Sequence, residues 1–117
     1  GCVHYAFMIQ RTIENGISQV YAEGADILRK AAGYEQQDVG RTFKNWNESV
    51  GGGWMSSYLT GISSRIYYKR DTVTKTGFVV DHIIDSIVSD PVDTWAKLEA
   101  TRLGVPAHSY MERCFSV

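Results

Sequence analysis

The 117 residues predict an α+β fold of the ferredoxin-like type, a split βαβ sandwich in which an antiparallel sheet has its helices packed on one face. Two observations predict this fold. The apolar runs follow the order strand, helix, strand, strand, helix pair, strand. The length suits a single α+β domain over residues 1–117, and the 44% of hydrophobic residues suffices for one core.

The first half of the chain predicts one strand and one long helix. Residues 3–9 form an apolar run rich in β-branched and aromatic side chains, which indicates a buried strand. Apolar residues then recur at helical spacing between a capping Thr12 and a terminating Gly33. Residues 34–53 are polar and turn-rich, and we expect an ordered excursion anchored by Phe43, Trp46 and Val50.

The second half predicts a hairpin, two helices and a last strand. Residues 54–59 and 62–68 read as strands, and two residues between them are a hairpin length. Residues 78–88 have helical spacing, although their β-branched content makes a strand a competing interpretation. Ser89-Asp90-Pro91 predicts a helix start, with a capping residue and then Pro at the first helical position, and Gly104 predicts its end. Residues 107–115 then complete the sheet.

The two cysteines, Cys2 and Cys114, lie near opposite ends of the chain. One interpretation is a pair of reduced thiols, and the other is a disulfide in a secreted protein. We favour the disulfide, because closing a loop of nearly the whole chain would stabilise the fold by about 4–5 kcal/mol in chain-entropy models. The predicted topology also places the first and last strands side by side, which brings both cysteines to one end of the sheet.

Further features agree with a secreted protein. Asn47-Glu48-Ser49 fits the N-glycosylation sequon, and Lys69-Arg70 is a dibasic pair of the kind that processing proteases cut. Gly1 reads like a mature terminus left by cleavage. No apolar stretch reaches the roughly 18 residues that a membrane span requires. The formal net charge of −1, without a long basic run, predicts no nucleic-acid partner.

Residues with chemical potential are few, and we expect no catalytic residue, no metal site and no cofactor. Asp81, His82 and Asp85 could form a metal or acid–base group, although no Cys/His spacing typical of zinc is present. Polar residues of the predicted strand 62–68 and its end could instead bind a partner; these candidates are Arg65, Tyr67, Lys69 and Arg70. With Tyr68 and His108, the same residues could serve a small RNA-cutting toxin.

The run Gly51-Gly52-Gly53-Trp54-Met55-Ser56-Ser57-Tyr58-Leu59 resembles Gly- and Trp-containing stretches in small secreted fungal proteins of the killer-toxin-like kind. This resemblance, together with the order of elements, implies an exported α/β-sandwich protein that acts on competitor cells or a host, with no enzymatic site.

The function predicted from these features is that of a secreted toxin-like or effector-like domain, which binds a protein or cell-surface target without catalysis. Two alternatives stay open at this point. The first is a small ribonuclease-type toxin, and the second is an intracellular inhibitor or interaction protein. The state of the two cysteines separates the secreted hypothesis from both alternatives.

Overall fold

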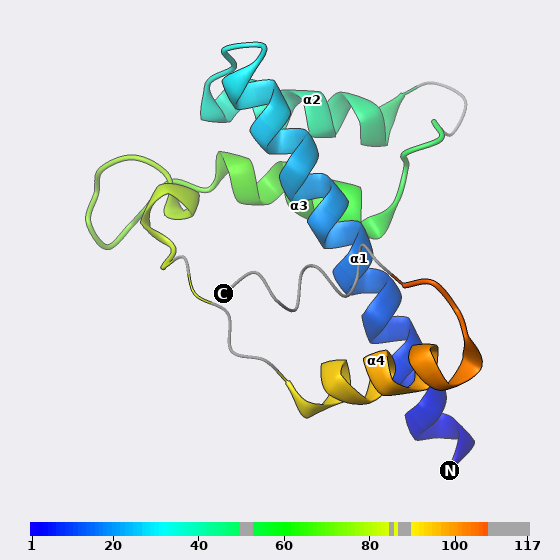
Figure 1. The fold of residues 1–117 in the computed structure, drawn as a ribbon. Coiled ribbons are helices and arrows are strands. Elements are labelled where there is room, and N and C mark those ends of the chain that lie inside the picture. Colours follow the sequence, from blue (N-terminus) through cyan, green and yellow to red (C-terminus); the bar gives the residue numbers. More distant parts are fainter. Residues whose placement is uncertain (50–52, 85, 87–89, 108–117) are drawn as a thin grey trace. The chain divides into compact units, whose positions relative to one another are not determined.

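The structure is a computed structural model that describes residues 1–49, 53–84, 86 and 90–107 (Figure 1). This part of the chain contains helices and no strand. The elements are α1 (Cys2–Lys30), α2 (Gln36–Glu48), α3 (Tyr58–Tyr68), the 3₁₀ helix η1 (Val79–His82) and α4 (Pro91–Leu103). The predicted α+β, ferredoxin-like sandwich is therefore wrong, and the described residues are all-α.

The helices divide into two compact units. The first unit draws its described residues from 1–20, 86 and 90–107, and the second from 21–49 and 53–84. Helix α1 contributes its first part to one unit and its last part to the other. The prediction of a single domain over residues 1–117 stays a prediction.

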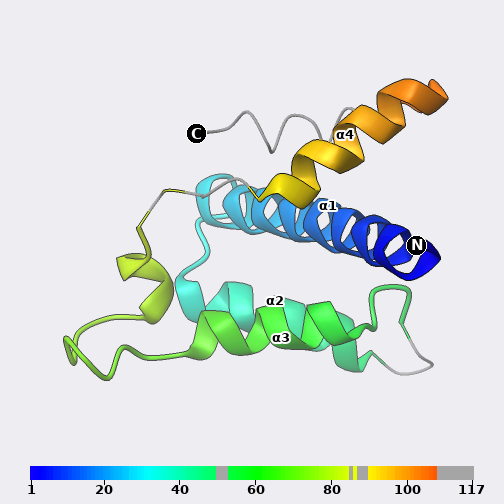
Figure 2. The same ribbon diagram turned by 90° about the horizontal axis from the view of Figure 1, so that it is seen from below.

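The first unit packs α4 against the first part of α1 (Figure 2). Met8 of α1 and Ala96 of α4 are both buried and form a small apolar cluster, to which Val92 adds. Asp90 caps α4 by accepting a hydrogen bond from the backbone N–H of Val92 at 3.0 Å. Gly104 ends this helix with a φ of +66°, so the predicted start and end of this helix are confirmed.

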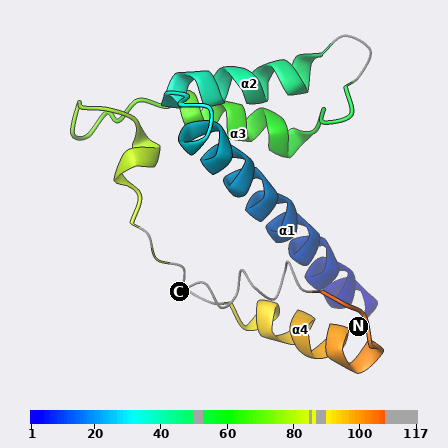
Figure 3. The same ribbon diagram turned by 45° about the horizontal axis from the view of Figure 1, so that its top comes forward.

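In the second unit, α2 and α3 run side by side in opposite directions (Figures 1 and 3). Val39 and Phe43 of α2 are fully buried with Ala25 of α1. Phe43 is at the centre of an aromatic cluster. Its ring lies 5.4 Å from that of Tyr21, 5.2 Å from that of Trp46 and 5.7 Å from that of Tyr67. Of the three predicted anchors, Phe43 and Trp46 are confirmed and lie on a helix, whereas Val50 lies outside the described residues.

A network of hydroxyl groups begins α3. The Ser57 side chain accepts a hydrogen bond from the backbone N–H of Thr60 at 3.1 Å, which is an N-cap. Thr60 is fully buried, and its hydroxyl lies 2.6 Å from that of Tyr21 and donates to the carbonyl of Met55. Thr60 and Gly61, expected as a hairpin turn, are therefore in the first turn of a helix.

The segment after α3 folds back on itself. An isolated β-bridge joins Arg70 to Phe78, and the Arg70 guanidinium lies 5.5 Å from the centre of the Phe78 ring. The Asp71 carboxylate holds the intervening turn by accepting from the Val73 backbone and the Thr74 hydroxyl. These hydrogen bonds, that from Thr74 first, lower the pKa of Asp71.

Several predicted elements differ from those observed. Residues 3–9 and 54–68, predicted as strands, lie in α1 and in α3 with the turn before it. A short apolar run does not distinguish a strand from a helix by its periodicity. The predicted helix over 78–88 is wrong as far as the structure describes it, since η1 ends at His82. The predicted strand over 107–115 lies almost entirely outside the described residues.

Candidate functional site

A row of polar contacts joins α1 to α4 in the first unit. The Tyr5 hydroxyl donates to the Glu99 carboxylate at 3.2 Å, and the Asn15 amide donates to Asp93 at 3.2 Å. Arg11, which lies between Tyr5 and Asn15 along α1, forms an ion pair of 2.9 Å with Asp90, the N-cap residue of α4. Tyr5, near the start of α1, contacts the second half of α4, whereas Arg11 and Asn15 contact residues at the beginning of α4. The two helices therefore run in opposite directions.

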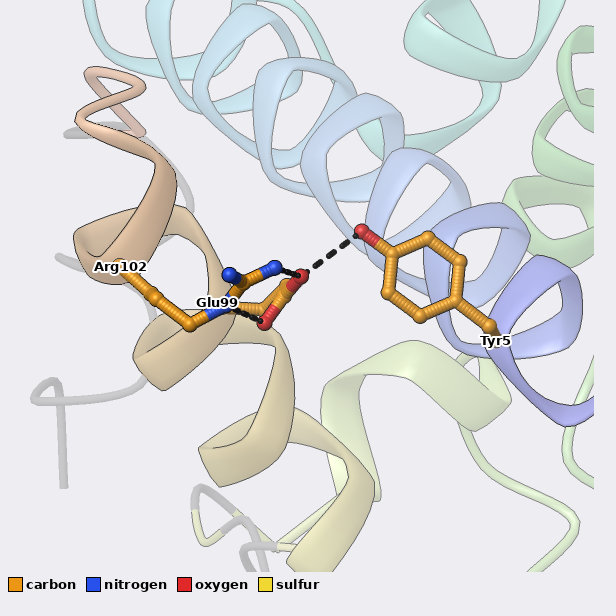
Figure 4. A network of polar contacts seen from close by, with 3 residues as sticks. All are labelled: Tyr5, Glu99 and Arg102. Atoms are coloured by element: carbon orange, nitrogen blue, oxygen red, sulfur yellow. Dashed lines mark hydrogen bonds and ion pairs between the residues drawn. The ribbon is translucent and has the colours of Figure 1, made fainter. Parts of the chain in front are cut away.

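Tyr5, Glu99 and Arg102 form the end of this row (Figure 4). The Arg102 guanidinium donates to both oxygens of Glu99, at 2.8 Å from Nε and 2.6 Å from a terminal nitrogen. These bonds hold the pKa of Glu99 below its ordinary 4.5. Loss of water around Tyr5 and the nearby Glu99 carboxylate raise the pKa of Tyr5 above 10.0. At neutral pH the group is therefore a neutral phenol, a carboxylate and a guanidinium.

A groove of about 590 Å³ runs along α1 beside Tyr5, and we call it the α1 groove. Its lining is mainly apolar and comprises Tyr5, Ala6, Ile9, Gln10, Ile13 and Glu14. Gln10 donates to Glu14 at 3.0 Å, which places an amide and a carboxylate together at one edge. Among the described residues that line the α1 groove, Glu14 is the one with an acidic side chain.

A second hollow, of about 410 Å³, lies between α2 and α3 in the second unit, and we call it the α2–α3 pocket. Helix α2 contributes Lys44, Asn47 and Glu48, and α3 contributes Gly61, Ser64, Arg65 and Tyr68. This lining carries two cations and one carboxylate.

The four residues predicted to bind a partner do not share a strand edge. Arg65 is exposed on α3 and lines the α2–α3 pocket, whereas Tyr67 stacks on Phe43. Burial raises the pKa of Tyr67 above 10.0. Lys69 is the C-cap of α3, and Arg70 lies over the Phe78 ring. Their role in binding stays a prediction, and Arg65 lines the α2–α3 pocket.

The predicted disulfide loses its geometric support. Cys2 is exposed in the first turn of α1, not on a strand, and Cys114 lies outside the described residues. The pairing of Cys2 with Cys114 therefore stays a prediction.

The predicted roles of His82 in a metal or acid–base group and of His108 in RNA cutting are not supported by a contact among the described residues. His82 lies 3.0 Å from the Thr76 carbonyl through its Nε2, while Asp85 and His108 lie outside the described residues. Across the described ranges, no group of three or more His, Cys, Asp or Glu side chains could hold a metal ion. None of the helices in the described part of the chain is long and apolar enough to cross a membrane.

Comparison with known proteins decides the family. Residues 3–116 match the model of the 6-phosphogluconate dehydrogenase C-terminal domain. The chain belongs to this family. It is 31% identical over 116 residues to the decarboxylating 6-phosphogluconate dehydrogenase of Lactococcus lactis (strain IL1403), a match that covers 99% of this chain and 24% of the relative. The enzyme of Dictyostelium discoideum is 32% identical over 120 residues, with the same coverage.

A solved structure supports the same assignment to the 6-phosphogluconate dehydrogenase family. The chain is similar to Plasmodium falciparum 6-phosphogluconate dehydrogenase with a TM-score of 0.84 and 29% identity, covering 96% of this chain and 23% of that one. That enzyme was solved in its apo form, with its cofactor NADP+ and with its substrate 6-phosphogluconate. The present chain spans about a quarter of the length of the relatives it matches.

Membership of a 6-phosphogluconate dehydrogenase family overturns the predicted function. A secreted toxin-like or effector-like domain is wrong, as are the ribonuclease-type toxin and the intracellular inhibitor, because the matched proteins are dehydrogenases. The killer-toxin resemblance is also wrong. Of its residues 51–59, those that the structure describes form a turn and the start of α3, not a strand. Secretion, inferred from the cysteines, the sequon and the dibasic pair, is corrected by the same matches.

Sequence reasoning missed the contacts of α1 with α4. Tyr5, Met8, Arg11 and Asn15 recur every three or four residues, which is the spacing of one helix face. This spacing lies within and just after residues 3–9, for which the apolar run predicts a strand. Reading the helical spacing from residue 5 onward would have extended the helix and exposed the polar row.

Proposed function

We propose that this chain acts as a helical domain of a decarboxylating 6-phosphogluconate dehydrogenase, in which it contributes to substrate binding and to contact between subunits. The observation that carries the proposal is the match of residues 3–116 to one domain model, together with the TM-score of 0.84 to a 6-phosphogluconate dehydrogenase. The activity belongs to a protein about four times longer than the matched segment.

We assign binding of the dinucleotide cofactor, NADP+ in the solved relative, to other parts of such an enzyme. The common cradle for a dinucleotide pyrophosphate is a Gly-rich turn between a strand and a helix. The described residues of this chain contain no strand, so they do not fit that cradle. We therefore assign no step that involves the dinucleotide to this chain.

The polar edge of the α1 groove suits a polyhydroxylated substrate. Gln10 and Glu14 together offer amide donors and carboxylate acceptors, and Tyr5 adds a hydroxyl that is already positioned by Glu99. Oxidation of an alcohol requires a group that accepts its proton. Glu14 is the carboxylate that this groove supplies, and any further acid or base comes from elsewhere in the enzyme.

The apolar part of the α1 groove, which Ile9 and Ile13 line, suits a protein contact that leaves the polar edge at Gln10 and Glu14 to the substrate. Ile9, Ile13 and Val20 lie on the first part of α1, and Ile13 and Val20 are 57% and 59% exposed. Exposed apolar side chains gathered on one helix face are typical of interaction surfaces. We assign this face to the contact between subunits.

The activity can be tested by exchanging the domain. Residues 3–116 replace the matched segment of the Lactococcus lactis enzyme, and the reduced dinucleotide formed from 6-phosphogluconate is followed by its absorbance. We expect turnover above that of the enzyme lacking the segment. Glu14→Gln should lower kcat by at least about tenfold if Glu14 handles a proton. Glu35→Gln, an exposed residue before α2, is the matched control and should leave kcat unchanged.

Subunit contact has a separate readout. The mass of the exchanged protein in solution, measured by light scattering, should match that of the parent oligomer and fall in an Ile13→Glu variant. Val73→Glu in the exposed turn before Phe78 is the control and should leave the mass unchanged. An exchanged protein that folds but neither associates nor turns over substrate would contradict the proposal.

A further inference from the structure

The α2–α3 pocket has the chemistry of an anion site, and we propose that it binds a small molecule bearing a phosphate group. It lies wholly within the second unit and has no part in the α1 groove. Its volume of about 410 Å³ falls in the range of small-molecule sites, roughly 300–1,000 Å³. The proposal is independent of the dehydrogenase function.

One wall of the pocket is an amide whose orientation is set by its partner. The Asn47 side-chain oxygen accepts a hydrogen bond from the backbone N–H of Ser57 at 3.0 Å. This leaves the Asn47 amide nitrogen on the side of Gly61, where it lies 3.2 Å from the position that a Cβ of residue 61 would occupy. Any side chain at residue 61 would press against that nitrogen, so Gly61 keeps the donor accessible.

Helix α3 contributes the guanidinium group of Arg65 to the pocket. Its Nε donates to the Gly61 carbonyl at 3.3 Å, which holds the guanidinium along α3. Among the described residues, its terminal nitrogens have no hydrogen-bond or ion-pair partner. Two terminal nitrogens in one plane match two oxygens of a phosphate, the geometry for which arginine is favoured over lysine.

Lys44 completes the positive charge. Its ammonium lies 4.0 Å from the Glu48 carboxylate, the outer limit of an ion pair, and both side chains are more than half exposed. Such a pair contributes little, so the ammonium can turn to an incoming anion at small cost. Ser64 donates its proton to the Gly61 carbonyl and has no further proton to offer a ligand.

The balance of charge selects the ligand class. Lys44 and Arg65 outweigh Glu48 by one positive charge, and Asn47 adds a neutral donor on the same pocket. A phosphate ester fits these groups, because its oxygens accept from all of them while its organic part can lie against the Tyr68 ring. A divalent cation does not fit, since one carboxylate faces two cations.

The test is an NMR titration of the 117-residue chain with inorganic phosphate and with glycerol phosphate, at ionic strength held constant with sodium chloride. We expect saturable shifts of amide signals in α2 and α3, with a Kd on the order of millimolar, and tighter binding of the ester. Arg65→Gln and Lys44→Gln should each raise the Kd about fivefold, the factor typical of losing one exposed charge contact. Glu48→Gln should lower the Kd by a few-fold, because it removes the opposing carboxylate.

Lys75→Gln is the control for net charge. Lys75 lies in the turn after Asp71 and outside the pocket lining, so its loss should leave the Kd within about twofold of the parent value. Three outcomes would overturn the proposal: the absence of saturable shifts, equal weakening by Arg65→Gln and Lys75→Gln, or weaker binding in Glu48→Gln. None of these outcomes bears on the domain-exchange assay, so the two proposals succeed or fail separately.

Discussion

Two glycines in the second unit should respond in opposite ways to the same added methyl group. Gly24 lies within α1, and no described atom outside its own helix neighbourhood is within 4 Å of the position that a Cβ would take. Gly40 lies buried in α2, where a Cβ would come within 3.2 Å of the Tyr67 Cβ and of two atoms of the Tyr68 ring. Both glycines have helical neighbours on each side, so replacing either by alanine should stabilise the helix backbone by a comparable amount.

Gly24→Ala should raise the free energy of unfolding by about 1 kcal/mol, since alanine loses less backbone entropy than glycine in a helix. Gly40→Ala should gain the same backbone contribution to the free energy of unfolding. It should lose at least as much again, because overpacking typically costs about 1–3 kcal/mol. The Tyr67 Cβ belongs to the base of its side chain and cannot rotate away, and its ring is stacked on Phe43. The whole of α3 would have to shift by a few tenths of an ångström.

The measurement is urea unfolding followed by circular dichroism at the helix band. For Gly24→Ala we expect a higher midpoint with an unchanged slope, and for Gly40→Ala a midpoint at or below that of the parent chain. If Gly40→Ala stabilised the chain as much as Gly24→Ala, the close packing of α2 on α3 at this point would be refuted.

Two further predictions follow from the packing and the polar row. Phe43→Ala should lower the free energy of unfolding by about 3–5 kcal/mol, because the ring is 1% exposed and touches three other aromatic rings, and urea unfolding measures the loss. Phe43→Leu is the milder control and should lose less than half as much. Because Arg102 lowers the pKa of Glu99 in the folded chain, Glu99 stabilises the fold above its ordinary pKa of 4.5, and this contribution is lost as the pH falls through the lowered value. The urea midpoints of the parent chain and Glu99→Gln should therefore differ at pH 7 and converge as the pH falls well below 4.5. A difference that stays constant with pH would contradict the role of the ionised carboxylate.

Three helix ends were predicted correctly from the residues themselves, whereas the predicted cap Thr12 lies in the interior of α1. Asp90 and Pro91 begin α4, and Gly104 ends it in the left-handed conformation. Gly33, predicted to terminate the first long helix, has a φ of +68°, three residues after Lys30. These signals are local, because a cap satisfies backbone groups within the same turn. Such signals can be recognised without knowledge of what the helix packs against.

Residues 3–9 and 54–68 show where local signals were insufficient. Their β-branched and aromatic content favours a strand, yet intrinsic preference is weak and context overrides it. Met8 is buried against Ala96 some ninety positions away along the chain. Thr60 is buried beside Tyr21, with its hydroxyl 2.6 Å from the tyrosine hydroxyl. Each contact requires the segment to be helical, and neither can be read from the segment alone.

The function was beyond the reach of composition and short motifs. Two cysteines, one sequon and one dibasic pair suggested a secreted protein, but each of these patterns arises often by chance. Family membership is carried by a match over residues 3–116 and not by any of these short patterns. The candidate pockets depend on side chains brought together from different helices, such as Lys44 with Arg65.

The amino-acid sequence by itself determined the helix ends at Gly33, Pro91 and Gly104, the helical register of residues 13–31 and the anchoring role of Phe43, because these depend on nearest neighbours and on hydrophobicity. The tertiary structure decided that residues 3–9 continue α1, that residues 58–68 form α3 and that Arg65 faces a pocket lined also by α2. The physical reason is that burial against a distant partner, such as Met8 on Ala96, outweighs the small preference of an isolated segment.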